Sequence, residues 1–304
     1  MMNFKNLKEL MMNLSDEKVC REYVEQMRWK GNPICPHCKG ANPYKLKDGK
    51  TYRCKEKTCK RDFTVTVGTI MENSKIALST WMAAIYICSA HKKGISSLQL
   101  SRDLGITQKS AWFVLHRVRQ LMGEPIDKMD SIVEVDETYV GGKWENMNRG
   151  KLKEMRKYGR ENKVPVMGFV QRDGKARLTV IGKDSFKDVV RKNIHNSATV
   201  ITDTHLSYQG LKFEFAGHEF VNHSQSEYRN GITYTNTVEG FFSILKRTIF
   251  GTYHQVSPKH LHRYCEETAY RYNTRKVKDN ERFNLTMQNV EGRLTYNNLI
   301  QKVN

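Results

Sequence analysis

The first 68 residues combine one helical stretch with one stretch that has no helical period. After Ser15, which can cap a helix, apolar residues recur every four positions until Gly31-Asn32-Pro33 interrupts the pattern. Residues 34–67 are rich in cysteine, and their β-branched runs predict hairpin strands at Thr51–Arg53 and Phe63–Val67. We therefore expect residues 1–68 to form an N-terminal helix followed by a small domain of short strands.

Residues 75–122 follow a helical pattern throughout. Breaks at Gly94 and Gly105 divide them into three predicted helices: Trp81–Ala90, Ser96–Leu104 and Gln108–Met122. The last two predicted helices have the layout of a helix-turn-helix. Gly105 lies at the turn, and Thr107 can cap the helix that follows. A plain helical bundle would show the same apolar stripes, so that alternative stays open at this point.

After Pro125 the pattern changes to β-branched runs separated by helical stretches. Strands are predicted at Ile132–Val135, Val166–Val170, Leu178–Ile181 and Thr199–Ile201, and helices at Phe186–Ile194, Val238–Ile249 and Leu261–Tyr272. This order predicts an α/β domain over residues 126–285, with a C-terminal tail over 286–304. The highly charged stretch 143–163 has few apolar residues and is expected to be a mobile insertion.

The overall charge adds a class of partner to this picture. The formal charge is +19 and the isoelectric point about 9.6, and because basic residues recur in every segment they indicate a polyanion, of which nucleic acid is the commonest. No apolar stretch predicts a transmembrane helix, and Met1–Leu14 lacks the features of a secretory signal. We expect a cytoplasmic protein with no membrane partner, whose seven cysteines bind metal more readily than they form disulfides.

Four cysteines have the spacing of a zinc ribbon: Cys35, Cys38, Cys54 and Cys59. Fifteen residues separate the two pairs, and the second pair encloses four residues where the usual ribbon has two. Four thiolates leave no open coordination position, so the expected zinc ion is structural and replaces a core that so short a segment cannot supply. His37 could compete as a ligand. The other three cysteines, Cys20, Cys88 and Cys265, fit helical core positions.

Basic residues accompany both predicted DNA-binding elements. Eight of them surround the cysteines: Lys45, Lys47, Lys50, Arg53, Lys55, Lys57, Lys60 and Arg61. In the last of the three helices Lys109 could face base edges or phosphates, and Arg117 and Arg119 could reach phosphates. A basic ribbon beside a helix-turn-helix predicts that residues 69–125 bind DNA, although ribbons also bind proteins.

Two aspartates lie in or at the end of β-branched strands. Asp136 lies within the run that begins at Ile132, and Asp203 lies where the strand after Ala198 ends. Ligand sites of open α/β sheets lie near the carboxyl ends of strands, so the two acids could meet there. Converging carboxylates repel each other unless a cation neutralises them, and oxygen ligands favour Mg²⁺ or Mn²⁺. Glu134 shares the strand face of Asp136 and is an alternative ligand, whereas Glu137 points away.

A third acid, Glu239, lies on an amphipathic helix. The apolar face of this helix carries Val238, Phe242 and Leu245. Lys246 follows Glu239 by seven positions, about two turns, so both side chains project from one side. Glu239 could bind a metal ion while Lys246 binds a phosphate, and this combination suits phosphoryl transfer. Glu227 is an alternative to this third acid.

With these motifs the chain resembles the zinc-ribbon-bearing DDE transposases of bacterial insertion sequences, in the ISXO-type branch. The resemblance rests on Cys35-Pro-His-Cys38, Val135-Asp136-Glu-Thr-Tyr-Val-Gly-Gly142, Asp203, Asn236-Thr-Val-Glu239-Gly-Phe-Phe-Ser-Ile-Leu-Lys246-Arg247, Gly251-Thr-Tyr-His254 and Arg271-Tyr-Asn273-Thr-Arg275. The 35 residues between Asp203 and Glu239, and the offset from Glu239 to Lys246, are typical of the DDE superfamily.

The resemblance implies a multidomain fold: a zinc ribbon, a helix-turn-helix region and an α/β catalytic core like that of RNase H. In such a core Asp136 lies on the first strand, Asp203 follows the fourth, and Glu239 lies on the helix that completes a site for two Mg²⁺ ions. Some members of this branch have asparagine as the third residue, so Asn236 is expected to bind metal or substrate. Lys246 and Arg247 are expected to hold the DNA backbone.

The implied function is transposition of an insertion sequence. The protein would bind the terminal inverted repeats and target DNA, act as a homo-oligomer in the bacterial cytoplasm near the nucleoid, and catalyse strand cleavage and strand transfer. Two alternatives remain. The chain could be a DNA-binding regulator or decayed transposase without catalysis, or a nuclease with an RNase H fold.

Overall fold

The computed structural model describes residues 4–123, 127–142, 148–150, 153, 163–204, 206–221 and 233–301. It divides the chain into two compact units, which we describe separately. The first contains Met1–Met122 together with Lys276–Asn304, and the second contains Gly123–Arg275. The expected insertion at 143–163 lies largely outside the described residues, and so does Glu227.

The first unit is helical around a largely apolar helix, α3 (Leu78–Ala90). Ten of the thirteen residues of α3 are buried, because helices pack against it on several sides. These include α1 (Leu7–Asn13), α2 (Glu17–Trp29), α4 (Ser97–Leu104) and α5 (Gln108–Gln120). Asp16 caps α2 by accepting from Lys18 N, so the cap lies one residue after the Ser15 predicted from the sequence.

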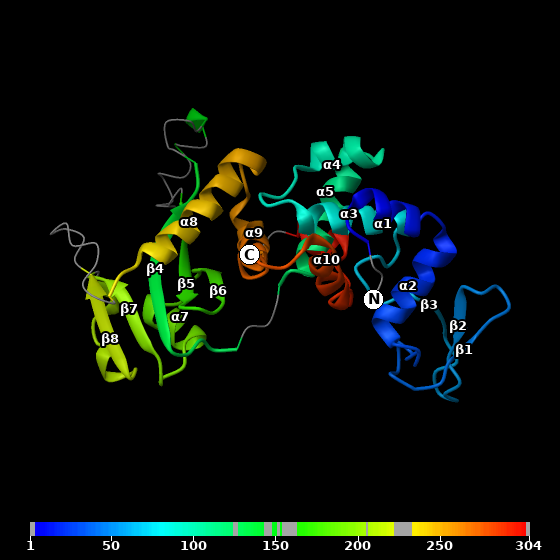
Figure 1. The fold of residues 1–304 in the computed structure, drawn as a ribbon, viewed down its shortest axis with the longest axis horizontal. Helices are drawn as coiled ribbons and strands as arrows, with labels where there is room; N and C mark the ends of the chain where they lie inside the picture. Colours follow the sequence, from blue (N-terminus) through cyan, green and yellow to red (C-terminus); the bar gives the residue numbers. More distant parts are fainter. Residues whose placement is uncertain are drawn as a thin grey trace. The chain divides into compact units, whose positions relative to one another are not determined.

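The cysteine-rich region of this unit forms a small antiparallel sheet in the order β1-β2-β3. Its strands are β1 (Tyr44–Lys45), β2 (Thr51–Arg53) and β3 (Asp62–Thr64), at the blue end of the ribbon in Figure 1. Tyr52 and Phe63 face each other in this sheet, and their stacked rings pack against Trp29 at the end of α2. This aromatic cluster joins the sheet to the helices.

Helices α4 and α5 are joined by the turn that the sequence predicts. Gly105 has a φ of 64°, a left-handed conformation that glycine adopts without strain. Thr107 caps α5 by accepting from Ser110 N, and Gln108 Nε2 donates to Ser97 Oγ at 2.8 Å. The two helices therefore have a fixed mutual orientation, with the start of α5 exposed.

The C-terminal segment returns to the first unit. Helix α10 (Asp279–Gln288) packs against α3 and α2 and buries Phe283 and Met287. The chain then pairs with residues near the ribbon, and α11 (Tyr296–Ile300) follows. The second unit ends at Arg275, whereas the sequence places the end of the α/β domain at 285.

The second unit is built on a mixed five-stranded sheet in the order β6-β5-β4-β7-β8. The strands are β4 (Ile132–Val140), β5 (Val164–Gln171), β6 (Ala176–Val180), β7 (Thr199–Asp203) and β8 (Gly217–Val221). The first three form an antiparallel meander, whereas β7 runs parallel to β4, and β8 parallel to β7. The sheet occupies the green and yellow-green part of the ribbon in Figure 1.

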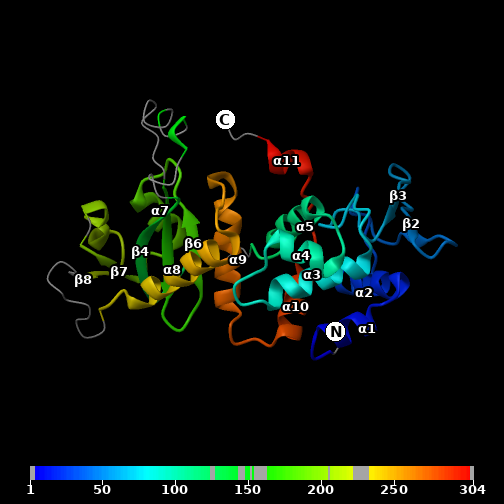
Figure 2. The same cartoon turned by 90° about the horizontal axis from the view of Figure 1, so that it is seen from above.

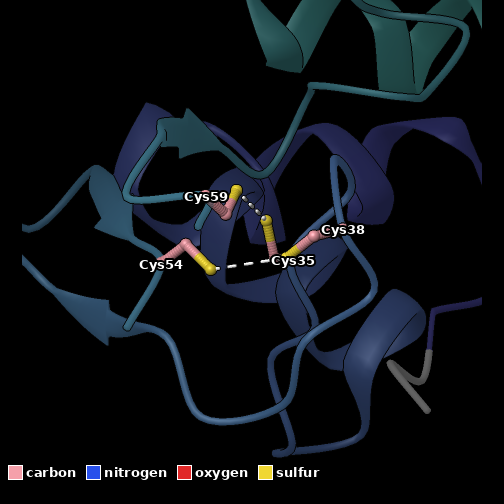
Figure 3. Close-up of side chains that lie close together, drawn as sticks. All are labelled: Cys35, Cys38, Cys54 and Cys59. Atoms are coloured by element: carbon pink, nitrogen blue, oxygen red, sulfur yellow. Dashed lines mark hydrogen bonds between the residues drawn. The ribbon is translucent and has the colours of Figure 1, made fainter. Parts of the chain in front are cut away.

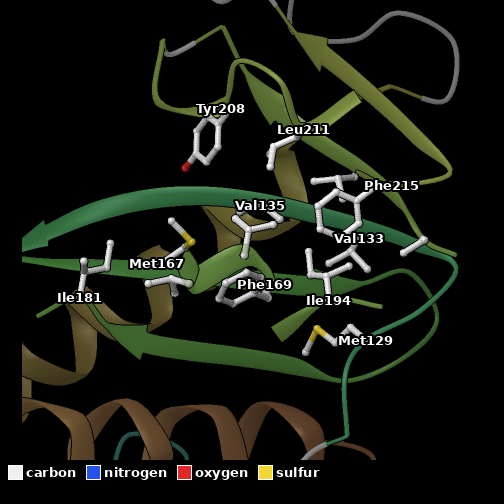
Figure 4. Close-up of a cluster of buried hydrophobic side chains, with 14 residues drawn as sticks. Met129, Val133, Val135, Met167, Phe169, Ile181, Ile194, Tyr208, Leu211 and Phe215 are labelled. Carbon is white, nitrogen blue, oxygen red and sulfur yellow. The ribbon is translucent and has the colours of Figure 1, made fainter. Parts of the chain in front are cut away.

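Helices cover both faces of this sheet. One face packs against α8 (Asn236–Thr248) and α9 (Leu261–Asn273), which lie next to each other in Figure 2. On the other face, side chains of β4, β5 and β7 form a core with α7 (Phe186–Asn193) and with two short helical turns, η2 (Leu206–Tyr208) and η3 (Leu211–Phe213). Figure 4 shows Val133, Val135, Phe169, Tyr208 and Phe215 within this core.

Several described elements have no counterpart among the elements predicted from the sequence, among them α1, β8, α10 and α11. Strand β8 reads Gly-His-Glu-Phe-Val, which has no β-branched run. None of the helices in the described parts of the chain is long and apolar enough to cross a membrane.

Candidate functional site

The four predicted zinc ligands come together at one point. The Sγ atoms of Cys35, Cys38, Cys54 and Cys59 all lie within 4.8 Å of one another (Figure 3). Cys35 Sγ is 3.9 Å from Cys59 Sγ, and Cys38 Sγ is 3.5 Å from Cys54 Sγ. Tetrahedral zinc with Zn–S bonds of about 2.3 Å holds its sulfurs about 3.8 Å apart, so this cluster fits a zinc ion.

Two tight turns aim these sulfurs inward. In the first, Lys39 N donates to Cys35 O, and Gly40 N donates to Cys38 Sγ at 3.4 Å. In the second, Lys60 N donates to Glu56 O, so the longer loop between Cys54 and Cys59 also ends in a hydrogen-bonded turn. Lys39 and Lys60 both have positive φ, at 61° and 45°. His37 lies outside the cluster, with its ring against Phe63.

The two aspartates are brought together by the pairing of β4 with β7. Glu134 pairs with Ile201 at the end of this parallel ladder, and Asp136 and Asp203 each lie two residues further along their strands. Residues two positions further along share the face of the first pair, so both acids lie side by side on the face that α8 covers. Asp203 is the last residue of β7, at the carboxyl end of the strand.

The charges of Asp203 and Glu239 both act on Asp136. Burial, together with the charges of Glu137, Asp203 and Glu239, raises the pKa of Asp136 to about 7, although its carboxylate accepts a hydrogen bond from Glu137 N at 2.8 Å. Asp203 on β7 and Glu239 on α8 are therefore close enough to Asp136 on β4 for their charges to affect it. Among the described residues they are less tightly gathered than the four sulfurs.

The outer face of α8 carries the remaining residues expected at this site. Glu239 and Asn236 are exposed and one turn apart, and Lys246 and Arg247 are exposed two turns further along. Arg247 Nε donates to Ser243 O, which holds its side chain along the helix. Glu239 therefore shares α8 with an exposed basic end two turns further along.

Two neighbouring glutamates have other partners. Glu134 is fully buried and accepts hydrogen bonds from the start of α8 and from Arg172. Glu137 accepts a hydrogen bond from Tyr208 at 2.5 Å on the opposite side of the sheet. Glu134 is thus occupied within the fold, which argues against its role as the alternative metal ligand.

Two of the arginines expected to contact DNA are instead buried in the first unit. Arg117 is 5% exposed, and its guanidinium donates to the carbonyls of Leu294, Ile70 and Glu72. Arg119 is 1% exposed. The returning chain covers Arg117 at Leu294, and both arginines are buried, so the expected phosphate contacts do not fit this arrangement and that prediction is corrected.

Lys109 and the ribbon lysines remain at the surface. Lys109 lies at the exposed start of α5, with its Nζ 5.3 Å from the ring centre of Tyr296. All eight basic residues around the cysteines are exposed, although Lys45 pairs with Glu25 and Arg53 with Asp62. The basic surfaces of the first unit are therefore the ribbon and the start of α5.

Comparisons with known proteins match both units. Residues 128–273 match the ISXO2-like transposase domain, and residues 15–62 match the transposase zinc-ribbon domain. A protein of Halobacterium salinarum, described as an uncharacterized protein in transposable element ISH50, is 27% identical over 246 residues. The matched stretch covers 76% of this chain and 82% of that protein.

Proposed function

Because this chain belongs to the ISXO2-like transposases of insertion sequences, we propose that it binds the ends of such an element and catalyses metal-dependent cleavage and transfer of DNA strands. The observation that carries this proposal is the convergence of Asp136, Asp203 and Glu239 from two parallel strands and one helix. The match over residues 128–273 includes all three acids and the sheet that holds them.

The strand order and directions support an RNase H-like core. An antiparallel meander of β4, β5 and β6 is followed by β7 and β8, which run parallel to β4 and extend the sheet on its other side. This is the strand arrangement that the resemblance implies, with Asp136 on the first strand and Asp203 at the end of the fourth.

The donor set of the site suits Mg²⁺ or Mn²⁺. Asp136, Asp203 and Glu239 offer only carboxylate oxygens, which are the ligands that these cations prefer. When bound, the cations would supply Lewis-acid activation of the attacking water or 3′-hydroxyl and neutralise the phosphate. Burial raises the pKa of Asp136, and the negative charges of Glu137, Asp203 and Glu239 raise it further, which a bound cation would offset.

The residues of α8 would hold the DNA beside these acids. Lys246 and Arg247 are exposed on the same helix as Glu239 and would bind phosphates of the scissile strand. Asn236, one turn before Glu239, would bind the substrate or share the metal with it. Substitution of Glu239 by glutamine and of Asn236 by alanine, each assayed for Mn²⁺ binding, separates these two roles.

Recognition of the element ends would fall to the first unit. The ribbon, with a structural zinc ion on its four cysteines, and a helix-turn-helix formed by α4 and α5 present the exposed basic residues, including Lys109. Transposases of this class act on paired ends, so we propose a homo-oligomer assembled on DNA.

The test is cleavage of DNA that carries the element's own inverted repeats, with Mg²⁺, with Mn²⁺ and with EDTA. We expect Asp136→Asn and Asp203→Asn to lower the cleavage rate at least about 100-fold while DNA binding persists. Asp173→Asn is the matched control, because Asp173 is exposed and has a φ of 56° that asparagine tolerates. Cutting by Asp136→Asn at the wild-type rate would refute the catalytic assignment.

The alternatives give different results in the same assay. Binding of the repeats without any cutting by the wild type would identify a regulator or decayed transposase. Cutting of unrelated DNA without strand joining would identify a nuclease.

A further inference from the structure

The two glutamates that flank Asp136 contact the helix that carries Glu239 and a short helical turn that begins three residues after Asp203. Glu134 contacts the start of α8, which carries Glu239. Glu137 contacts Tyr208 in η2, the turn that follows Asp203. Strand β4 thus provides one acid of the site and an attachment point for each of the other two.

Glu134 acts as the cap of α8. Its Oε2 accepts from Thr237 N at 3.0 Å and from Val238 N at 3.2 Å, whereas the residue before the helix, Thr235, makes no side-chain cap. A carboxylate at a helix N-terminus satisfies its free N–H groups and interacts favourably with the helix dipole. Glu239 follows Thr237 by two residues, so the cap fixes the turn that carries this acid.

Arg172 completes the attachment from the turn between β5 and β6. Its Nε donates to Glu134 Oε1 at 3.2 Å, its guanidinium lies 3.9 Å from the ring centre of Tyr234, and it donates to Tyr234 O. Thr237 Oγ1 also donates to Glu134 Oε1. The two oxygens therefore accept four hydrogen bonds, which uses the acceptor capacity that a metal would need.

Glu137 makes the second attachment on the other face of the sheet. Tyr208 is 1% exposed and is part of the core there, and its hydroxyl donates to Glu137 Oε2. Burial, together with the charge and the hydrogen bond of Glu137, raises the pKa of Tyr208. Because Tyr208 lies five residues after Asp203, this bond attaches η2 to β4 close in sequence to Asp203.

We propose that Glu134 and Glu137 are positioning residues, which fix Glu239 and Asp203 relative to Asp136 before a cation binds. This inference rests on the proposed function, since it assigns roles toward the same three acids. Ligands that are already fixed before the metal binds lose less conformational entropy when it binds. Groups that orient metal ligands contribute about 10- to 100-fold in metal affinity.

The test uses two substitutions that leave every carboxylate in place, namely Arg172→Met and Tyr208→Phe. Binding of Mn²⁺ alone is measured by isothermal titration on the full-length, DNA-free protein. We expect each variant to bind Mn²⁺ about 10-fold more weakly than wild type, because each loosens one attachment. Removal of the positive charge of Arg172 would by itself strengthen cation binding, so the expected change has the opposite sign to the electrostatic one.

Matched controls exist in the same unit. Arg191→Met breaks an ion pair with Glu214, and Tyr253→Phe breaks hydrogen bonds to Glu267, and neither pair includes one of the three acids. Both controls should bind Mn²⁺ as wild type does. Circular dichroism of all variants identifies any that fail to fold.

Hydrogen–deuterium exchange of the metal-free protein supplies a readout that does not involve metal. Glu134→Gln should accelerate exchange at Thr237 and Val238, because an amide group cannot accept both N–H groups and also accept from Arg172. Exchange in the segment around Tyr208 should stay unchanged. Glu214→Gln serves as the matched control and should leave both segments unchanged.

The outcomes separate this inference from the proposed function. If wild type binds Mn²⁺ and Asp203→Asn does not, but Arg172→Met and Tyr208→Phe bind as tightly as wild type or more tightly, then the positioning roles are refuted while the proposed function stands. If wild type binds no Mn²⁺, both the positioning roles and the proposed function are refuted. Weaker binding by both variants, with unchanged controls and faster exchange at the start of α8 in Glu134→Gln, supports the proposal.

Discussion

Gly168 lies directly opposite Asp136 in the antiparallel pairing of β5 with β4. Paired residues share a face of the sheet, so Gly168 faces α8 as Asp136 does. A Cβ at Gly168 would lie 2.6 Å from Phe242 Cε1 and 2.8 Å from Val238 Cγ2. The missing side chain therefore allows α8, with Glu239, to lie close to the strand that carries Asp136.

We expect Gly168→Ala to destabilise the second unit by about 1–3 kcal/mol, because the added methyl group pushes α8 away from the sheet. The measurement is chemical denaturation followed by circular dichroism. Gly240→Ala on the same helix is the control, since nothing lies within 4 Å of its Cβ position, and alanine should leave stability unchanged or raise it by up to about 1 kcal/mol. Equal stability of Gly168→Ala and wild type would contradict the close packing.

The zinc ribbon should depend on its metal. Replacement of Cys54 by serine removes one of four thiolates, and the ribbon, which has few apolar residues apart from the cluster of Trp29, Tyr52 and Phe63, should lose its fixed structure. Zinc content by elemental analysis should fall from one ion per chain, and proteolysis should become faster within residues 34–64. Cys88→Ser, which changes a buried cysteine of α3, is the control and should keep its zinc. A Cys54→Ser protein with full zinc content would refute the four-ligand site.

Arg117 should matter for stability and not for direct contact with DNA. Its guanidinium donates to three buried carbonyls, and lysine cannot reach all of them, so Arg117→Lys should cost about 2–4 kcal/mol in the free energy of unfolding. Lys109→Ala should leave stability within about 0.5 kcal/mol and weaken DNA binding. The slope of the logarithm of DNA affinity against the logarithm of salt concentration separates the two residues. Loss of one phosphate contact lowers the magnitude of this slope by about one. Arg117→Gln removes the positive charge, so a folded Arg117→Gln protein with a reduced slope would show that Arg117 does contact a phosphate.

Asn273 at the end of α9 should stabilise the outer part of the sheet. Its amide accepts from Ala176 N at 2.8 Å and donates to Ala176 O at 3.0 Å, so one side chain satisfies both backbone groups of the first residue of β6. We expect Asn273→Ala to destabilise by about 1–3 kcal/mol and to speed hydrogen exchange in β6. Asn273→Asp keeps the acceptor but loses the donor and should show a smaller loss. Unchanged exchange in β6 would contradict this account.

Local signals in the sequence were sufficient for several features. The spacing of Cys35, Cys38, Cys54 and Cys59 predicted one cluster, because ligands on tight turns are fixed by sequence distance alone. Gly105 and Thr107 predicted the end of one helix and the start of the next, since caps and left-handed turns act over a few residues. The family motifs likewise indicated a transposase, and the comparisons agree.

Other features depend on contacts between residues far apart in the chain. The sequence placed Arg117 on the surface because its own helix is basic, but the returning segment around Leu294 buries it. Glu134 had the position of a metal ligand on its strand, yet a helix more than one hundred residues later uses it as a cap. Neither outcome has a local signal, because each partner lies in a different element.

The sequence by itself therefore determined the element types, the cysteine cluster, the family and the identity of the candidate acids. Only the tertiary structure decided which acids meet, through the parallel pairing of β4 with β7, and which neighbours hold them there. It also decided that the chain returns to its first unit after Arg275. The physical reason is that periodicity and capping act within a few residues, whereas sheet order and burial arise when distant segments cover each other's apolar faces.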